Sequence, residues 1–114
     1  MKKYKTLAGL LAKPERWCKS AAARTEDGET TQEDDPRACA FCLWGGVLLI
    51  YGNRLHPRCK EMSAHNLIEK ATEDVFPNVG KSSPYFNDAA ETSHADMLRV
   101  ARRIDLIMKA RAAK

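Results

Sequence analysis

The sequence has no long hydrophobic run and few aromatic residues. Its longest apolar stretch, Leu43 to Tyr51, is far shorter than the roughly 20 residues that a membrane-spanning helix needs. The apolar run near the start, Thr6 to Ala12, is interrupted on both sides by Lys5 and Lys13. No small-residue cleavage site of the kind that ends a signal peptide follows it. We therefore expect a cytoplasmic protein without a membrane segment.

Internal repeats, coiled-coil heptads and low-complexity tracts are also missing, which argues against solenoids and fibres. The chain has 114 residues, of which 44% are hydrophobic and 30% are charged. These values are typical of one globular domain with its own core. We predict a single, mainly α-helical domain over residues 1–114, with about four helices around a central apolar helix, with or without one small β-hairpin.

Positive and negative charges are segregated along the chain. Residues 1–24 contain seven Lys or Arg and one acid, residues 26–35 contain six acids and no base, and residues 99–114 contain six bases and one acid. The formal net charge is +4. The basic ends could attract an anionic partner, or they could pair with the acidic segment within the same fold. The sequence leaves both interpretations open, and it does not indicate an oligomeric state.

Start and stop signals place the main helices. Asp35 and Pro36 are a typical helix start, and the apolar residues that follow predict a helix over residues 36–51. Because this helix is apolar on all sides, we expect it at the centre of the molecule. The pair Gly45-Gly46 would weaken it unless another helix comes close there. We expect the final helix, residues 94–112, to cross at this point.

Weaker signals predict the remaining elements. A short N-terminal helix should end at Pro14, and a third helix should extend from about residue 57 to residue 76. The turn signal Glu26-Asp27-Gly28 predicts a hairpin between segments 17–24 and 29–31.

Two half-sites for a metal ion lie at the ends of the apolar stretch. Cys39 and Cys42 form one pair with zinc-ligand spacing, and His56 and Cys59 form the other. On a helix the two pairs would be separated by about 13 Å, which the next four residues, at about 3.3 Å each, could only just cover. The alternative is that these cysteines are small buried side chains. We predict no metal and no cofactor, and we keep a zinc-binding module as an alternative.

The basic final helix suggests a second alternative, which is nucleic-acid binding. No aromatic stacking residue or recognised motif accompanies its cations, so a solvated helix face explains them equally well. Cys18 could act as a nucleophile beside a histidine, but no local signature surrounds it. We therefore expect a protein that is not an enzyme. The cations concerned are Arg99, Arg102, Arg103, Lys109 and Arg111.

The most specific stretch precedes the final helix. Asn87 and Asp88 can accept hydrogen bonds from downstream amides in an Asx-turn, and Phe86 can hold the loop on the core. Together with Trp17 they would form an aromatic residue flanked by fixed polar groups, as binding hot spots often do. We predict that Trp17, Phe86, Asn87 and Asp88 contact a protein partner.

These motifs, in this order, resemble a family of small proteins of unknown function from actinobacterial and bacteriophage genomes. The resemblance extends over most of the chain. In the family pattern only Cys42 is a regular cysteine, an aromatic tryptophan is usual at Phe86, and an arginine is usual at Thr92. The matching residues are Trp17, Ala22, Asp27-Gly28, Asp35-Pro36, Ala38, Phe41 to Gly45, Phe86-Asn87-Asp88, Ser93 and Asp96.

The resemblance implies a protein of phage or mobile-element type but no activity. Because Cys39 and Cys59 have no counterpart in the pattern, it argues against the zinc interpretation. It also argues against thiol catalysis, because a hydroxyl residue is common at Cys18. We expect a small non-enzymatic protein that binds a protein partner, for example a host defence or regulatory factor.

Overall fold

The computed structural model describes residues 4–55, 63–77 and 85–112. In this part of the chain, helices outweigh a small antiparallel sheet, which confirms the mainly α-helical prediction. In chain order the elements are α1 (Leu7–Leu10), the 3-10 helix η1 (Pro14–Arg16), β1 (Ala23–Thr25), β2 (Thr30–Thr31), β3 (Ala38–Phe41), α2 (Leu43–Tyr51), the 3-10 helix η2 (Gly52–Arg54), α3 (Ala64–Val75), α4 (Tyr85–Asp88) and α5 (His94–Ala112).

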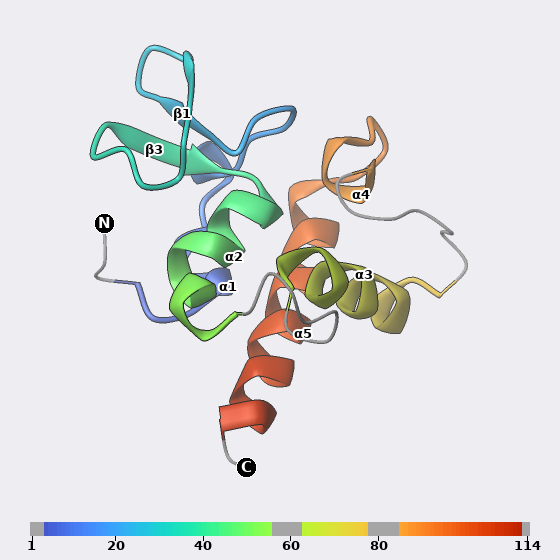
Figure 1. Ribbon diagram of the computed structural model, residues 1–114. Helices are drawn as coiled ribbons and strands as arrows, with labels where there is room; N and C mark the ends of the chain where they lie inside the picture. Colours follow the sequence, from blue (N-terminus) through green and yellow to red (C-terminus); the bar gives the residue numbers. More distant parts are fainter. Residues whose placement is uncertain (1–3, 56–62, 78–84, 113–114) are drawn as a thin grey trace.

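Helix α5 is the longest element and packs against both α1 and α3 (Figure 1). The sheet lies beyond the start of α2, at the end of the molecule opposite the C-terminus. The predicted bounds 94–112 are confirmed, as is the capping role of Ser93, whose Oγ accepts a hydrogen bond from the Asp96 amide at 3.1 Å. The inner face predicted from helical spacing is also found, because Met97, Val100, Ala101, Ile104 and Met108 are all buried.

Helix α1 is short, and a side chain from the other end of the chain holds its first turn. The Asp105 carboxylate of α5 accepts hydrogen bonds from the amides of Leu7 at 2.8 Å and Ala8 at 2.9 Å. It also accepts one from the Tyr51 hydroxyl at the end of α2. A carboxylate at a helix N-terminus satisfies free amides and suits the helix dipole. Asp105 therefore ties α1 and α2 to α5.

The prediction of one helix over residues 36–51 is wrong in its first third. Residues 38–41 form strand β3, and α2 starts only at Leu43, with Cys42 as its N-cap. The Cys42 Sγ accepts a hydrogen bond from the Gly45 amide at 3.3 Å. Asp35 lies in a turn rather than at a helix start. Its carboxylate still accepts a hydrogen bond from a backbone amide two residues ahead, that of Arg37, at 2.9 Å. Pairing of β3 with β1 outweighs the helical preference of its alanines.

The hairpin predicted around Glu26-Asp27-Gly28 is confirmed, and β3 adds a third strand to it. The strand order is β2-β1-β3, with antiparallel pairs throughout. Ala23 lies opposite Thr31 on one side and Phe41 on the other, and the register shifts after Arg24. Gly28 forms the turn with a φ of +84°, which favours glycine.

Helix α2 is not surrounded on all sides as expected. Leu43 and Val47 are fully buried, but Trp44 is 38% exposed. The two glycines do permit close approach, although the nearest atoms do not belong to α5. A Cβ on Gly45 would lie 2.1 Å from the Ala22 carbonyl oxygen, and one on Gly46 would lie 2.7 Å from a methyl group of Leu7 in α1.

The third predicted helix corresponds to α3, which begins at Ala64 with Ser63 as its N-cap. Residues 57–62 of that prediction lie outside the described residues. Within the described ranges, none of the helices has the length and apolar character that crossing a membrane requires.

Candidate functional site

Asn87 connects three segments of the chain from a buried position: its own, the segment at Trp17 and Cys18, and the start of α2 at Leu43. Its side chain is 3% exposed. The Oδ1 atom accepts hydrogen bonds from the Trp17 indole at 2.7 Å and from the Leu43 amide at 3.0 Å. The Nδ2 group donates to the Cys18 carbonyl at 3.1 Å and to the Asp88 carboxylate at 2.9 Å. Both lone pairs and both N–H groups of the amide are thus used.

The Asp88 carboxylate is held in one orientation at the surface beside Asn87. Its Oδ1 accepts from Asn87 and from the Ser20 amide at 2.8 Å. Ser20 has a φ of +65°, a left-handed conformation that costs a residue other than glycine about 1–3 kcal/mol. Asp88 is exposed, and Oδ2 has no partner among the described residues. The backbone strain at Ser20 therefore accompanies a fixed carboxylate that still has a free oxygen.

A hollow of about 250 Å³ opens next to Asp88. We call it the Trp44 hollow because Trp44, at the start of α2, is 38% exposed beside it. Backbone and side-chain atoms of small residues form much of its wall, and His65, an exposed residue of α3, also borders it. The lining residues are Ala21, Ala22, Cys42, Trp44, His65, Asn87 and Asp88.

The structure brings together three of the four residues predicted to contact a partner. Trp17 is half-buried, hydrogen-bonded to Asn87, and lies 6.0 Å from the His94 ring between centroids. Phe86 points elsewhere: it is 4% exposed and packs against Phe76 at 5.6 Å between ring centroids. Phe86 and Asn87 therefore serve the core, and Asp88 is the exposed member of the set.

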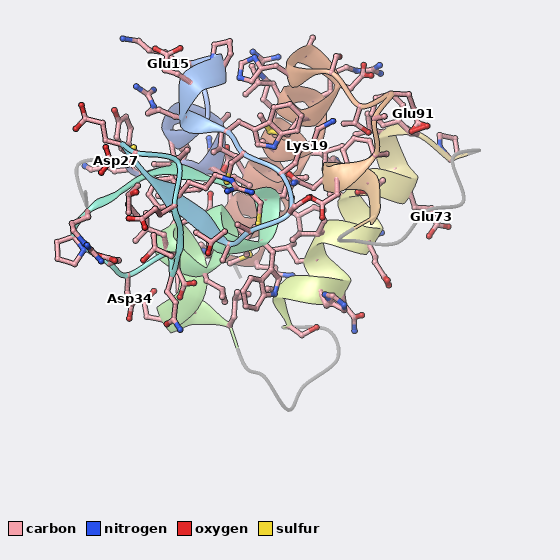
Figure 2. The ribbon with its side chains drawn as sticks, turned by 90° about the horizontal axis from the view of Figure 1, so that it is seen from above. Glu15, Lys19, Asp27, Asp34, Glu73 and Glu91 are labelled. Atoms are coloured by element: carbon pink, nitrogen blue, oxygen red, sulfur yellow. The ribbon has the colours of Figure 1, made fainter. Side chains whose placement is uncertain are left out.

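Lys19, labelled in Figure 2, links the segment before the sheet to the turn between α4 and α5. Its ammonium group donates to the carbonyls of Ala89 at 2.5 Å and Thr92 at 3.1 Å, in the turn between α4 and α5. It also lies 5.3 Å from the Trp17 ring centroid. The segment 17–20 and the segment 87–92 are thus joined along their length, which fixes the position of Asp88.

Cys18 and Cys42 are buried thiols in the segments that Asn87 joins. Burial, and secondarily the nearby Cys42, raises the pKa of Cys18 to about 11. Burial also raises the pKa of Cys42. A nucleophilic cysteine requires the opposite change, a lowered pKa. These thiols are therefore protonated at neutral pH, as expected of structural cysteines.

The proposed zinc ligands are only partly within the described residues. Cys39 lies in β3 and Cys42 caps α2, so the expectation that both lie within one apolar helix is wrong. His56 and Cys59 lie outside the described residues. Among those that the structure does describe, no three histidines, cysteines or acids are grouped as metal ligands would be. The expectation of no metal stays a prediction, and the zinc-binding module stays its alternative.

The cations of α5 lie on different sides of the helix. Arg99 stacks over the Phe76 ring at 4.7 Å, and Arg103 forms an ion pair with Asp74 of α3 at 2.9 Å. Arg102 and Lys109 border a separate hollow at the other end of the molecule. Nucleic-acid binding stays an alternative. Asp35, the last acid of segment 26–35, forms an ion pair with Arg37, just beyond that segment, at 3.1 Å.

Sequence analysis missed Ser20, Trp44 and His65 as part of this site. Trp44 lies inside an apolar run that indicates burial, and no local pattern reveals which face of α2 is open. The strain at Ser20 has no sequence signal, because serine does not favour a positive φ.

Comparison with known proteins adds a family but no activity. Residues 4–104 match the model of a family described as a family of unknown function, DUF6197. No curated protein and no solved structure matches the chain.

Proposed function

We propose that this chain, which belongs to the family of unknown function DUF6197, is a non-enzymatic protein that binds a protein partner through the Trp44 hollow. The observation that supports this is a fixed, exposed carboxylate next to an exposed tryptophan over an apolar hollow. We infer that the hollow receives a basic side chain, arginine or lysine, of the partner.

The chemistry of the lining suits a cation on an aliphatic stem. A cation over a tryptophan ring gains about 0.5–2 kcal/mol, depending on how far water is excluded. The free Oδ2 of Asp88 can accept a charge-assisted hydrogen bond, which is stronger than a neutral one. The walls at Ala21 and Ala22 are apolar and can cover the methylene groups. No lysine or arginine of the described residues lines the hollow, and Asp88 has no ion pair among those residues.

The size of the hollow indicates one side chain rather than a whole small molecule. Its volume of about 250 Å³ lies below the range of about 300–1,000 Å³ that is usual for sites of drug-sized ligands. Asn87 and Ser20 already hold the carboxylate in place, so binding loses little side-chain entropy there. A preorganised carboxylate beside an aromatic side chain is what a hot spot for a partner's arginine requires.

The direct test uses capped tripeptides with a central arginine or citrulline, which have the same shape but differ in charge. Two-dimensional NMR of the 15N-labelled protein should show shifts at the Trp44 indole, His65 and Asp88 with the arginine peptide. Asp88→Asn keeps an acceptor for the Ser20 amide but removes the charge, so it should weaken binding about tenfold. Equal binding of the citrulline peptide would contradict the proposal.

The partner itself can be sought with matched variants. Proteins from the natural host that bind the wild-type chain should be lost with both Trp44→Ala and Asp88→Asn. They should be retained by Asn53→Ala, which changes an exposed residue away from the hollow. Retention by all variants would place the contact elsewhere. The phage origin and a host defence or regulatory role of the partner stay predictions.

A further inference from the structure

A second hollow lies beside the second half of α5. It has a volume of about 630 Å³ and is bordered by α5, by the segment before α1, and by the end of α2 with η2 (Figure 1). We call it the basic hollow, because four cations and one acid of the described residues border it. The cations are Lys5, Arg54, Arg102 and Lys109. They come from three separate segments, so positive charge surrounds the hollow rather than lying on one side of it.

The acid that borders the basic hollow is engaged within the fold. The Asp105 carboxylate accepts hydrogen bonds from the amides of Leu7 and Ala8 and from the Tyr51 hydroxyl. These bonds attach the start of α1 and the end of α2 to α5, and Lys5 lies two residues before α1. The partners of Asp105 are therefore the free amides of a helix start rather than the cations of the hollow.

The four cations are exposed, and their charges are available to a ligand. The guanidinium group of Arg54 donates to the Met108 carbonyl at 3.1 Å and lies 5.3 Å from the Tyr51 ring centroid. These contacts fix Arg54 in place, while its charge has no ion pair among the described residues. The other three cations have no side-chain hydrogen bond or ion pair with any described residue: Lys5, Arg102 and Lys109.

An exposed leucine lies among these charges. Leu106 is 58% exposed, and its spacing of four and three residues from Arg102 and Lys109 places the three on one face of α5. Covering an exposed leucine with an apolar group removes its surface from water, and the long stems of lysine and arginine add aliphatic area around it. The basic hollow therefore suits a ligand that carries negative charges next to an apolar group.

The basic hollow lacks the features that hold nucleic acid or a single phosphate. Proteins that bind single strands stack the bases on aromatic side chains, whereas the aromatic residue of this hollow, Tyr51, is 5% exposed and lies beneath Arg54. Phosphate groups are often held by the free amides of a helix start. At α1 the first amides are already bonded to Asp105. A peptide with acidic and apolar side chains needs neither feature.

We propose that the basic hollow binds an acidic segment of a polypeptide, in which aspartate or glutamate residues flank a large apolar side chain. The apolar side chain packs on Leu106, and the carboxylates pair with the surrounding cations. The volume of about 630 Å³ lies within the range of about 300–1,000 Å³ that is usual for ligand sites, so several side chains fit. The Trp44 hollow is lined by other residues and takes a cation, so this proposal does not rest on that site.

The direct test titrates the full chain with the capped peptide Asp-Glu-Leu-Leu-Glu-Asp in low salt, followed by calorimetry. One matched peptide replaces every acid with its amide, and a second replaces both leucines with serine. Each matched peptide should bind at least about tenfold more weakly than the acidic peptide, because one loses the charges and the other the apolar contact. Raising the salt from about 20 to about 300 mM should also weaken binding at least about tenfold.

Variants of exposed residues locate the contact without disturbing the core. Arg102→Gln with Lys109→Gln should weaken binding of the acidic peptide at least about tenfold, and Leu106→Ala at least about threefold. Lys13→Gln with Lys70→Gln changes the net charge by the same amount, and neither residue borders the basic hollow. This control should bind like the wild-type chain, and circular dichroism should show unchanged helix content in every variant.

Three results would overturn the proposal. They are an acidic peptide that does not bind at about 1 mM, an amide peptide that binds equally well, and a control variant that loses as much affinity as the Arg102 and Lys109 variant. Tighter binding of single-stranded oligothymidylate, or of vesicles that contain phosphatidylserine, would also overturn the choice of a peptide. The arginine-peptide titration at the Trp44 hollow should be the same for the Arg102 and Lys109 variant, so the two proposals fail or succeed independently.

Discussion

Replacing Asn87 with alanine should destabilise the protein more than the loss of one small polar side chain would suggest. The amide satisfies three groups from distant parts of the chain: the Leu43 amide, the Cys18 carbonyl and the Trp17 indole. Alanine leaves all three without their partner. A buried polar group that loses its hydrogen bond costs about 1–3 kcal/mol.

The expected magnitude follows from how accessible each group is. The bonds to Leu43 and Cys18 are buried, so those two groups bear the full cost, whereas the Trp17 bond is part-buried and can recover water. Two full losses and one partial loss give a destabilisation of about 3–5 kcal/mol. At about 4 °C per kcal/mol, the melting temperature should fall by roughly 12–20 °C.

Urea denaturation measures this change directly. Asn53→Ala is the matched control, because Asn53 is exposed, and it should change the free energy of unfolding by less than about 0.5 kcal/mol. Trp17→Phe removes one of the two donors to the Asn87 Oδ1 and should cost about 1 kcal/mol. A loss below about 1 kcal/mol for Asn87→Ala would refute the reasoning that these bonds are the main contribution of Asn87.

Three further changes test other parts of the fold. Gly45→Ala should cost about 3 kcal/mol or more, because the new Cβ would meet a backbone carbonyl at 2.1 Å, whereas Gly52→Ala meets nothing within 4 Å and should be neutral in the same urea assay. Asp105→Ala should cost about 3 kcal/mol in thermal denaturation, since three hydrogen bonds to a carboxylate are lost; an unchanged melting temperature would show that α1 does not depend on it. The raised pKa of Cys18, about 11 against its ordinary 9.0, means that burial of the neutral thiol contributes fully below pH 9, and that this contribution is lost as the pH rises toward 11. Cys18→Ala should therefore flatten the fall in unfolding free energy over that range, and an identical slope would contradict the assignment.

Much of the fold could be predicted where neighbouring residues carry the information. Helix α5 combines a capping serine with apolar residues at helical spacing, so its bounds and buried face follow from local sequence. The hairpin turn at Gly28 is similarly local, because only the residue at that position has to adopt a positive φ.

The boundary between β3 and α2 could not be predicted, because the same residues suit either structure. Alanine, cysteine and phenylalanine in the segment 38–41 have no alternating pattern, and the start signal at Asp35 serves a turn instead. What makes this segment a strand is β1, which is paired with it across the turn and β2. Such pairing depends on contacts that a local window does not contain.

The candidate site shows the same division. Asn87 and Asp88 could be recognised as hydrogen-bonding residues before a helix. The predicted Asx-turn is wrong, however, because their side-chain bonds among the described residues do not go to downstream amides. Their actual partners at Leu43 and Trp17 are 44 and 70 residues away. The sequence alone determined the turn at Gly28, the Ser93 cap and the apolar face of α5, since each depends on residues within one or two turns. Only the tertiary structure decided that Trp44 is exposed beside Asp88, because that placement depends on how distant segments pack.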